Sequence, residues 1–371
     1  MNILVCGDYV PIGRVAQDLE KSDYATIFNQ IKEITEQADY SIVNLEAPIV
    51  KQQALPIEKT GPNLKCTEKA IYSIKYAGFN CVTLANNHIR DYGDTGIQDT
   101  LELCKKNQVD YVGAGRNIED ACSTLYKEID NKKIAIINVC ESEWSIATEK
   151  AYGAAPLNVV RVSRQIQEAK NKADFILLII HGGVEHYNLP TPRMVETYRF
   201  FIDMGADAIV NHHQHCYSGY ELYGNKPIFY GIGNFCFDRG IERNRRWKEG
   251  YMVSLNFEKS ISFKIIPYVQ SDTTTTITVL PSDAYNENIE KLNKIINSPN
   301  KLKELFTELS KKKSSFYFNT LEPFNNRYIR KFQNMNLLPK VVNRNFKKKI
   351  LAITRCESHL ETFLSLLKSH F

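Results

Sequence analysis

The sequence predicts an α/β protein with mixed sheets, followed by a basic helical region, and three observations lead to this prediction. Short runs rich in β-branched residues alternate with amphipathic helical patterns through residues 2–210. Two tight-turn dipeptides, Asp130-Asn131 and Gly224-Asn225, each separate a pair of apolar runs, which is typical of a β-hairpin. Beyond residue 281 the strand patterns give way to helical patterns that are rich in lysine.

The alternating segments can be placed in order along the chain. Strands are expected at residues 2–7, 41–45, 81–84, 175–180 and 208–210, and helices at residues 24–37, 67–77, 95–106 and 191–204. Gly78 and Gly205 are expected to end two helices, because glycine readily adopts the left-handed conformation that follows a helix. The hairpins pair residues 123–129 with 132–139 and 219–223 with 226–231, and residues 251–258 and 262–268 form a further antiparallel pair.

The composition excludes several classes of protein. Of the 371 residues 43% are hydrophobic and 24% charged, which is neither disordered nor collagen-like. The longest apolar runs have the length of a strand, whereas a transmembrane helix needs ~20 apolar residues. The start of the sequence lacks the features of a signal peptide, and nine cysteines without a CxxC pair argue against a disulfide framework or a thiolate zinc site. We therefore expect a cytoplasmic protein with reduced thiols.

Charge is unevenly distributed along the chain. Residues 285–371 contain 17 Lys/Arg and 7 Asp/Glu, so residues 1–284 have a net charge of −5, against +5 for the whole chain. Lysine clusters occur at residues 311–313 and 347–349. The expected boundary lies near Pro281, which gives one domain at residues 1–281 and a helical basic region at residues 282–371.

The end of the basic region allows two interpretations. Apolar residues at near-helical spacing accompany the lysines in residues 345–371, which is typical of a helix lying on anionic lipid at the inner face of the membrane. A helix that packs on the domain and exposes its lysines to solvent gives the same pattern, and this interpretation is favoured. Nucleic acid is not an expected partner, because no recognisable nucleic-acid module surrounds the lysines.

Polar side chains gather directly after the expected strands. Ligands of open α/β sheets bind beyond the carboxyl ends of strands, so these residues are the first candidates for a functional site. Six of the eight histidines belong to this set. In chain order the set is Asp8, Asn44, Glu46, Asn86, Asn87, His88, His181, Glu185, His186, His212, His213 and His215.

This combination of side chains indicates divalent metal ions. Imidazole with carboxylate and amide oxygen suits Zn, Mn or Fe. His213 and His215 are expected on a strand, where residues two apart face the same side, so that both can reach one site while Gln214 points away. Two ions can be held if Glu46 bridges them, and the expected ligands are Asp8, Glu46, Asn87, His181, His213 and His215.

A pair of metal ions about 3.5–4 Å apart can stabilise both the entering and the leaving oxygen of a phosphoryl transfer. His88, next to Asn87, is then expected to act as a general acid or an oxyanion stabiliser, and Glu185 is the second candidate catalytic residue. The candidate substrate-binding residues are Arg14, Asn44, Asn86, His186, His212 and Asn234.

An arginine-rich run, residues 239–247, also allows two interpretations. It includes Arg243, Arg245 and Arg246, and it follows the polar segment that contains Asn234. A solvated loop is the favoured interpretation. The alternative is a loop that reaches an anionic substrate, in which the arginines form bidentate hydrogen bonds to phosphate or carboxylate.

An ordered series of motifs over residues 1–270 resembles a known family. The series includes Gly7-Asp8, Gly13-Arg14, Asn44-Leu45-Glu46, Ala85-Asn86-Asn87-His88 with Asp91, His181-Gly182-Gly183-Val184-Glu185, His212-His213-Gln214-His215 and Gly233-Asn234. On these residues the chain resembles the CapA family of bacterial capsule and poly-gamma-glutamate synthesis proteins, which is similar to the calcineurin-like metallophosphoesterases.

The resemblance implies a four-layer α/β/β/α sandwich of mixed sheets with a two-metal site. It implies Asp8 and His215 at the first metal, Glu46 as the bridge, and a second metal held by Asn87, His181 and His213. Two positions depart from the phosphoesterase pattern. Val10 stands where that pattern has a histidine ligand, and Glu46 stands where it has a bridging aspartate.

Two functions are compatible with these observations. The first is a metal-dependent, phosphoesterase-like hydrolase that acts on an anionic polymer or a phosphorylated substrate in the biosynthesis of a bacterial capsule or cell-surface polymer. The alternative is a non-catalytic factor for the assembly or export of an acidic capsular polymer such as poly-gamma-glutamate. The ligand series and His88 favour the hydrolase, whereas Val10 in place of a ligand favours the assembly factor.

Overall fold

The structure is a computed structural model that describes residues 1–51, 53–59, 61–240, 243–320, 326–335, 337–339 and 341–355. The chain divides into two compact units, Met1–Leu302 and Lys303–Phe371. The first unit extends past the boundary expected near Pro281, because helix α9 (Asn286–Ile296) packs against strand β11 (Tyr220–Tyr223). Asn293 of α9 accepts a hydrogen bond from the backbone N–H of Tyr220 at 2.7 Å.

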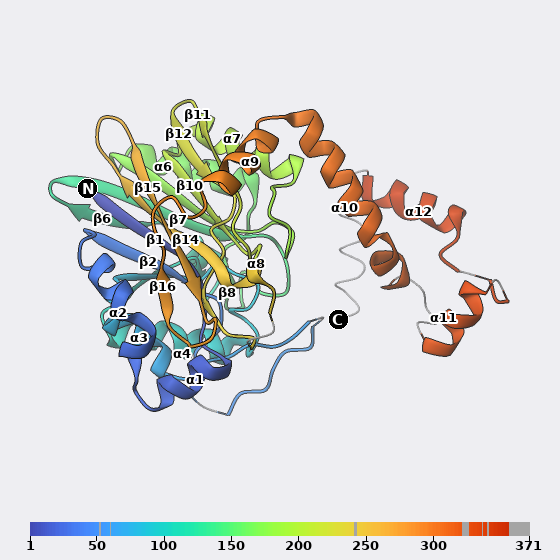
Figure 1. Ribbon diagram of the computed structural model, residues 1–371, viewed down its shortest axis with the longest axis horizontal. Coiled ribbons are helices and arrows are strands. Elements are labelled where there is room, and N and C mark those ends of the chain that lie inside the picture. Colours follow the sequence, from blue (N-terminus) through green and yellow to red (C-terminus); the bar gives the residue numbers. More distant parts are fainter. Residues whose placement is uncertain are drawn as a thin grey trace. The chain divides into compact units, whose positions relative to one another are not determined.

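Two mixed sheets form the centre of the first unit (Figure 1). The eight-stranded sheet has the order β16 (Ile277–Val279), β15 (Ser262–Gln270), β14 (Glu249–Asn256), β1 (Asn2–Val10), β2 (Tyr40–Leu45), β3 (Cys81–Thr83) and β4 (Asp110–Val112), and β13 (Asn234–Phe237) also pairs with β1. The six-stranded sheet has the order β11, β12 (Lys226–Phe229), β10 (Ala208–His212), β9 (Phe175–His181), β7 (Lys132–Cys140) and β6 (Leu125–Ile129). Strand β1 contacts β10 and β4 contacts β7, so the sheets face each other.

Helices cover the outer face of each sheet (Figure 1). The helices beside the first sheet are α1 (Gly13–Glu20), α2 (Tyr24–Thr35), α3 (Lys69–Tyr76) and α4 (Gly93–Lys106). Those beside the second are α6 (Val159–Lys170) and α7 (Pro192–Met204). Shorter elements are β5 (Ala114–Gly115), which pairs with β8 (Gly153–Ala154), and helices α5 (Ile118–Ala121) and α8 (Arg245–Lys248). The expected four-layer α/β/β/α sandwich is confirmed.

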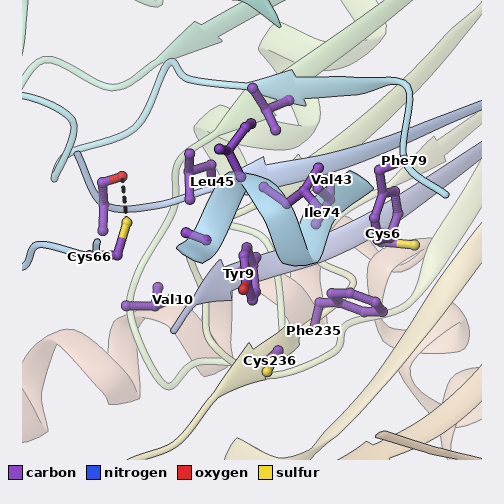
Figure 2. Packing of buried hydrophobic residues seen from close by; sticks show 14 of the residues in the cluster. Cys6, Tyr9, Val10, Val43, Leu45, Cys66, Ile74, Phe79, Phe235 and Cys236 are labelled. Atoms are coloured by element: carbon purple, nitrogen blue, oxygen red, sulfur yellow. Dashed lines mark hydrogen bonds between the residues drawn. The ribbon is translucent and has the colours of Figure 1, made fainter. Parts of the chain in front are cut away.

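The core explains why β1 and β2 lie in the middle of this arrangement. Cys6 of β1 and Val43 of β2 pack with Ile74 of α3 in one cluster (Figure 2), to which Leu4 of β1 also belongs. The intervening Val5 of β1 is fully buried as well. Successive residues of a strand point to opposite faces, so both faces of this sheet are covered.

The local signals in the sequence are confirmed where turn chemistry dictates the backbone. The hairpins β6–β7 and β11–β12 turn at the expected dipeptides, with positive φ angles of 51° and 60° at Asp130 and Asn131. Two positive φ angles are required by the tight turn that matches the twist of a hairpin. Gly78 and Gly205 follow the ends of α3 and α7, with φ angles of 81° and 124°.

The second unit is helical, as expected for the basic region. Its helices are α10 (Pro299–Thr320), which begins in the first unit, α11 (Arg327–Asn334) and α12 (Arg344–Arg355). Residues 356–371 lie outside the described residues, and they include Leu360, Phe363, Leu364 and Leu367 of the apolar pattern that is expected to face lipid or the domain. Within the described ranges, no helix combines the length and the apolar composition needed to cross a membrane.

Strand β1 changes its pairing partner along its length, and this change brings Asn234 next to Asp8. Residues 2–5 of β1 pair antiparallel with β14, whereas Asp8 pairs parallel with Asn234 of β13. Gly7 lies between the two pairings, and a Cβ atom placed there would lie 2.0 Å from the carbonyl oxygen of Gly233. The missing side chain therefore lets the backbone before β13 approach β1, which sets Asn234 beside Asp8.

Replacing Gly7 with Ala is expected to lower the stability of the protein by about 1–3 kcal/mol, because the contact is with backbone that cannot rotate away. The replacement Gly96→Ala is the control, because the nearest atoms there, at 3.1 Å, belong to the side chains of Pro48 and Tyr92. Thermal unfolding of both variants measures the difference. Equal melting temperatures would mean that the approach at Gly7 is not constrained.

Candidate metal centre

The six expected metal ligands lie together at the carboxyl edges of both sheets. Asp8 lies in the second half of β1, Glu46 follows β2, and Asn87 lies in the loop after β3. On the other sheet, His181 ends β9, and His213 and His215 follow β10. All six side chains are buried. Residues separated by up to 207 positions in the chain thus meet because both sheets end at the same place.

The ligand atoms form two groups that share one residue. Glu46, His181 and His213 offer ligand atoms within 4.8 Å of one another, and so do Asp8, Glu46 and His215. Carboxylates bridge metal ions readily because they have two oxygen atoms. Glu46 is therefore placed where a bridging ligand is expected, and its bridging of two ions stays a prediction.

The first of these groups contains three close contacts around one imidazole nitrogen. The Nε2 atom of His181 lies 3.4 Å from Oε1 of Glu46, 3.1 Å from Nδ1 of His213 and 3.1 Å from Oδ1 of Asn87. Burial lowers the pKa of His213 to about 4, and the nearby His215 contributes to the shift. Neutral imidazole is the form that binds metals, so this environment favours ligation.

The second group is centred on Asp8. Its Oδ2 atom lies 3.6 Å from Nδ1 of His215, and Nε2 of His215 lies 3.9 Å from Oε1 of Glu46. Burial opposes ionisation of Asp8, but contacts with His212 and His215 hold the pKa of Asp8 well below its usual range. Val10, at the position of the missing ligand, is fully buried in the hydrophobic core.

The surroundings of the Glu46 carboxylate indicate whether these residues are suited to bind a metal ion. Its side chain has no solvent exposure, and neither carboxylate oxygen has a hydrogen-bond partner among the described residues. Burial raises the pKa of Glu46 well above its usual value, and the charges of Asp8 and Glu185 raise it further. An unpaired buried carboxylate is strongly unfavourable, whereas a cation beside it would compensate the charge. The residues present therefore fit divalent ions.

Two asparagines orient the ligands. Nδ2 of Asn44 donates to Oδ1 of Asp8 at 2.7 Å and lies 3.3 Å from Nδ1 of His181. Nδ2 of Asn234 faces two carbonyl oxygens, of His215 and Trp247, so its Oδ1 atom is the group 2.9 Å from Nδ1 of His215. Nδ1 of His215 therefore donates, which leaves the lone pair of Nε2 for a metal. Asn44 and Asn234, expected to bind substrate, instead contact ligands.

The expected reason for the convergence of His213 and His215 was wrong. Strand β10 ends at His212, and the next residues form a loop in which His213 and His215 have positive φ angles of 88° and 55°. Such angles are uncommon for residues other than glycine, and they occur at sites where the surrounding structure enforces them. Gln214 points away from the ligands as expected, and its Nε2 atom donates to the carbonyl of Leu189.

His88 belongs to a second polar group. Its Nδ1 atom lies 2.6 Å from Oδ2 of Asp91 and 3.2 Å from Nζ of Lys59, and Lys59 also forms a buried ion pair with Asp91. Burial lowers the pKa of His88, and Asp91 opposes this shift. Since Nδ1 donates to the carboxylate, Nε2 is the nitrogen that can exchange a proton with a substrate.

The remaining candidates have different surroundings. The exposed Glu185 is influenced by several histidines, since burial raises its pKa but the charges of His215 and His213 lower it overall. The ring of His186 lies 6.0 Å from that of His215. His212 is buried, with Nδ1 3.2 Å from Oδ1 of Asp8.

Two expected substrate-binding residues have structural contacts instead. Arg14 forms an ion pair with Asp238, in which Nε and Nη2 each donate at 3.0 Å, and it also donates to carbonyls of residues 271–273. Its donors are thus used within the fold. Asn86 donates to the carbonyl of Leu45 at 2.8 Å and accepts from the backbone N–H of His88 at 3.1 Å, so it shapes the loop.

Sequence reasoning missed several residues that lie beside these groups. Lys59 comes from a loop without a periodic pattern, and nothing in the sequence connects it to His88. Glu143, whose Oε1 atom lies 3.7 Å from Nε2 of His213, follows β7 without a neighbouring histidine. The one signal that could have identified Glu143 is its place after a strand, because ligands bind beyond the carboxyl ends of strands. Asp91 was noticed only as part of a motif.

Replacing Glu46 with Gln is expected to have opposite effects on the metal-free and metal-loaded protein. In chelator-treated protein at neutral pH, the variant should melt at a higher temperature than the parent, because the raised pKa of Glu46 means that its buried carboxyl must either take up a proton or remain charged, and a neutral amide avoids both costs. With Mn or Zn added, the parent should gain stability through binding, and the variant much less.

Calorimetry with elemental analysis measures both effects. Glu128→Gln, at an exposed position of β6, is the control and should change neither melting temperature nor metal content. A Glu46→Gln protein that retains the metal content of the parent would contradict the bridging role.

Comparison with known proteins places this geometry in a family context. The chain is 31% identical over 256 residues to the capsule biosynthesis protein CapA of Bacillus anthracis, which covers 66% of this chain and 62% of that protein. It is 31% identical over 240 residues to the PGA biosynthesis protein CapA of Bacillus subtilis, with 64% and 63% covered. The chain thus spans less than two thirds of the length of these relatives.

A solved structure, a phosphatase from Mycoplasma pneumoniae, is similar with a TM-score of 0.44 and 19% identity, over 73% of this chain and 94% of that one. The family model described as bacterial capsule synthesis protein PGA_cap matches residues 2–239, a segment that contains all six candidate ligands and the His88 group. The chain therefore belongs to the bacterial capsule synthesis protein PGA_cap family.

Proposed function

We propose that this protein is a metal-dependent hydrolase of phosphoester bonds that acts in the synthesis of a bacterial capsule or related surface polymer. The observation that supports this proposal most strongly is the buried, unpartnered carboxylate of Glu46 between two groups of ligands. A structural role for Glu46 would require hydrogen bonds to its carboxylate, and among the described residues neither oxygen forms one, the nearest imidazole nitrogen being Nε2 of His181 at 3.4 Å from Oε1.

The residues fit two divalent ions such as Mn, Zn or Fe, held by Asp8, Glu46 and His215 and by Glu46, His181, His213 and Asn87. When bound, such ions supply Lewis-acid polarisation of a phosphoryl group and activation of a water molecule. Asn44 and Asn234 keep the ligands in position, since each contacts a ligand nitrogen or oxygen. The protein's own contribution is thus a fixed, largely dry set of ligands.

His88 is the residue that we assign to proton transfer. Asp91 accepts from its Nδ1 atom and orients the ring, and Lys59 neutralises the charge of Asp91 in this buried place. A protonated Nε2 can donate to the oxygen of the leaving group, which makes departure of an alkoxide easier. Because burial lowers the pKa of His88, the imidazolium is a stronger acid, but a smaller fraction of the protein carries it at neutral pH.

The polymer context comes from the relatives, whose names refer to capsule and PGA biosynthesis. We extend this context to the present chain as a proposal. The substrate is then an anionic polymer or a phosphorylated precursor, since both would approach a cationic centre favourably.

A non-catalytic role in polymer assembly is the second candidate. The burial of Val10 in the core supports it, because the group around Asp8 then has one ligand fewer than the phosphoesterase pattern. Elemental analysis of protein purified without chelator distinguishes the candidates, since an assembly factor does not need near-stoichiometric metal.

Replacing Asp8 with Asn or His213 with Asn is expected to reduce hydrolysis of an aryl phosphate by at least about a hundredfold in the presence of Mn or Zn, because each removes a ligand. The Glu128→Gln protein serves again as the control and should keep the parent rate. If both ligand variants turn over at the parent rate, the hydrolase proposal is wrong.

Replacing His88 with Asn is expected to reduce kcat by about 10²–10⁴-fold for phenyl phosphate and by much less for p-nitrophenyl phosphate, whose leaving group needs little protonation. The metal content should remain that of the parent, because His88 is outside the two ligand groups. Steady-state kinetics with the two esters measure the difference. An equal reduction for both would assign His88 to a role other than general acid.

A further inference from the structure

An aromatic pair borders the candidate metal centre on the side of His215. The rings of Phe237 and Trp247 lie 4.8 Å apart in an edge-on arrangement, and each contacts the ring of His215, at 5.4 Å and 5.0 Å. Trp247 is buried, and its indole N–H donates to the carbonyl of Phe237 at 2.9 Å. The pair is therefore a fixed surface next to a metal ligand.

Two arginines stack on this surface. The guanidinium carbon of Arg239 lies 4.9 Å from the ring centre of Phe237 and 5.6 Å from that of Trp247, and that of Arg243 lies 5.1 Å from Trp247. Both residues are exposed to solvent. Stacking on an aromatic face holds a guanidinium in one plane while leaving its N–H groups available to an anion.

The other arginines of this segment have different surroundings. Arg245 is paired with Glu249, and Arg246 lines a separate pocket of about 200 Å³. Within the described part of the chain, Arg239 and Arg243 form no ion pair with a carboxylate. Two positive charges that share one aromatic surface without such a pair are suited to an external anion.

Electrostatics place Arg239 close to the metal ligands. Burial lowers the pKa of Arg239, its neighbour Arg243 lowers it further, and the charges of Glu46 and Glu185 act in the opposite direction. Arg239 thus interacts electrostatically with Arg243 and with Glu46, the residue that belongs to both ligand groups. A substrate bound at the metal centre would have this pair of arginines beside it.

We infer that Arg239 and Arg243, stacked on Phe237 and Trp247, form a subsite for a second acidic group of the substrate, a carboxylate or a phosphate of a polyanion. The inference rests on the proposed function for the position of the reacting group. It narrows the substrate from any phosphoester to one with a further anionic group near the reacting one. For Arg239 and Arg243 this proposal takes the alternative interpretation, a loop that reaches an anionic substrate, because the buried Trp247 holds both side chains against its ring.

The test measures binding, so that it does not depend on turnover. A dye-labelled oligoglutamate is titrated with the full-length protein, and fluorescence anisotropy gives the dissociation constant. We expect Arg239→Ala and Arg243→Ala each to weaken binding about tenfold, the typical contribution of a hydrogen bond to a charged group. Arg239→Lys should lie between parent and Arg239→Ala, because lysine keeps the charge but loses the planar stacked contact.

Two controls separate specific from general effects of charge. Arg116→Ala removes an exposed arginine that is paired with Asp120, and it should bind as tightly as the parent. A labelled oligoglutamine, which has no carboxylates, should bind much more weakly than oligoglutamate. In a Trp144→Phe background Trp247 is the one remaining tryptophan, and a change in its emission on addition of oligoglutamate would locate the ligand.

Competition by inorganic phosphate then identifies the preferred anion. Displacement of the oligoglutamate by phosphate at low concentration indicates a phosphate subsite, and weak displacement indicates a carboxylate subsite. The inference is wrong if the parent binds neither anion, or if the Arg239→Ala/Arg243→Ala double variant binds like the parent. If the double variant loses binding but the parent hydrolyses no phosphoester, the proposed reaction is wrong and the anion subsite is still supported.

Discussion

The buried carboxylate of Glu46 is the constraint on which the centre of this molecule depends. It lies between two groups of ligands, has no hydrogen-bond partner among the described residues, and shares its surroundings with Asp8. Two acidic groups brought together away from water repel each other, and the neighbouring imidazoles are kept neutral by burial. Divalent cations bound between these carboxylates would supply compensating positive charge in a small volume. The proposed hydrolytic function rests on such ions.

The fold serves this centre by unusual backbone geometry at a few positions. Gly7 lets the chain before β13 approach β1, and Asn234 thereby comes within reach of His215. Positive φ angles at His213 and His215 turn two imidazoles toward the same ligands from a short loop. Such conformations are unfavourable in isolation and persist only where packing enforces them. The sandwich of two sheets, buried on both faces of β1, provides that rigidity.

The surroundings of the ligands are consistent with an anionic substrate. His88 directly follows the candidate ligand Asn87 in the sequence. Its ring contacts Asp91, which is paired with Lys59. Arg239 and Arg243 rest on the aromatic pair that contacts His215. The chain belongs to the PGA_cap family, and two of its relatives are named for capsule and PGA biosynthesis. Metal, proton donor and anion subsite would then act on one substrate.

The sequence by itself determined the α/β class and the two hairpins at Asp130-Asn131 and Gly224-Asn225, because turn dihedrals and strand periodicity are local properties. It also predicted which polar side chains gather at the strand ends, and their role as metal ligands stays a prediction. The four-layer arrangement came from a family resemblance, and the packing of two sheets confirmed it. Only the tertiary structure decided that Arg14 forms an ion pair with Asp238 and that Lys59 lies beside His88. It also decided that Arg239 stacks on Phe237, which contacts the candidate ligand His215. These contacts join residues far apart in the chain or loops without periodicity, so no local pattern encodes them. Burial, which left Glu46 without a partner, likewise exists only once both sheets have closed over it.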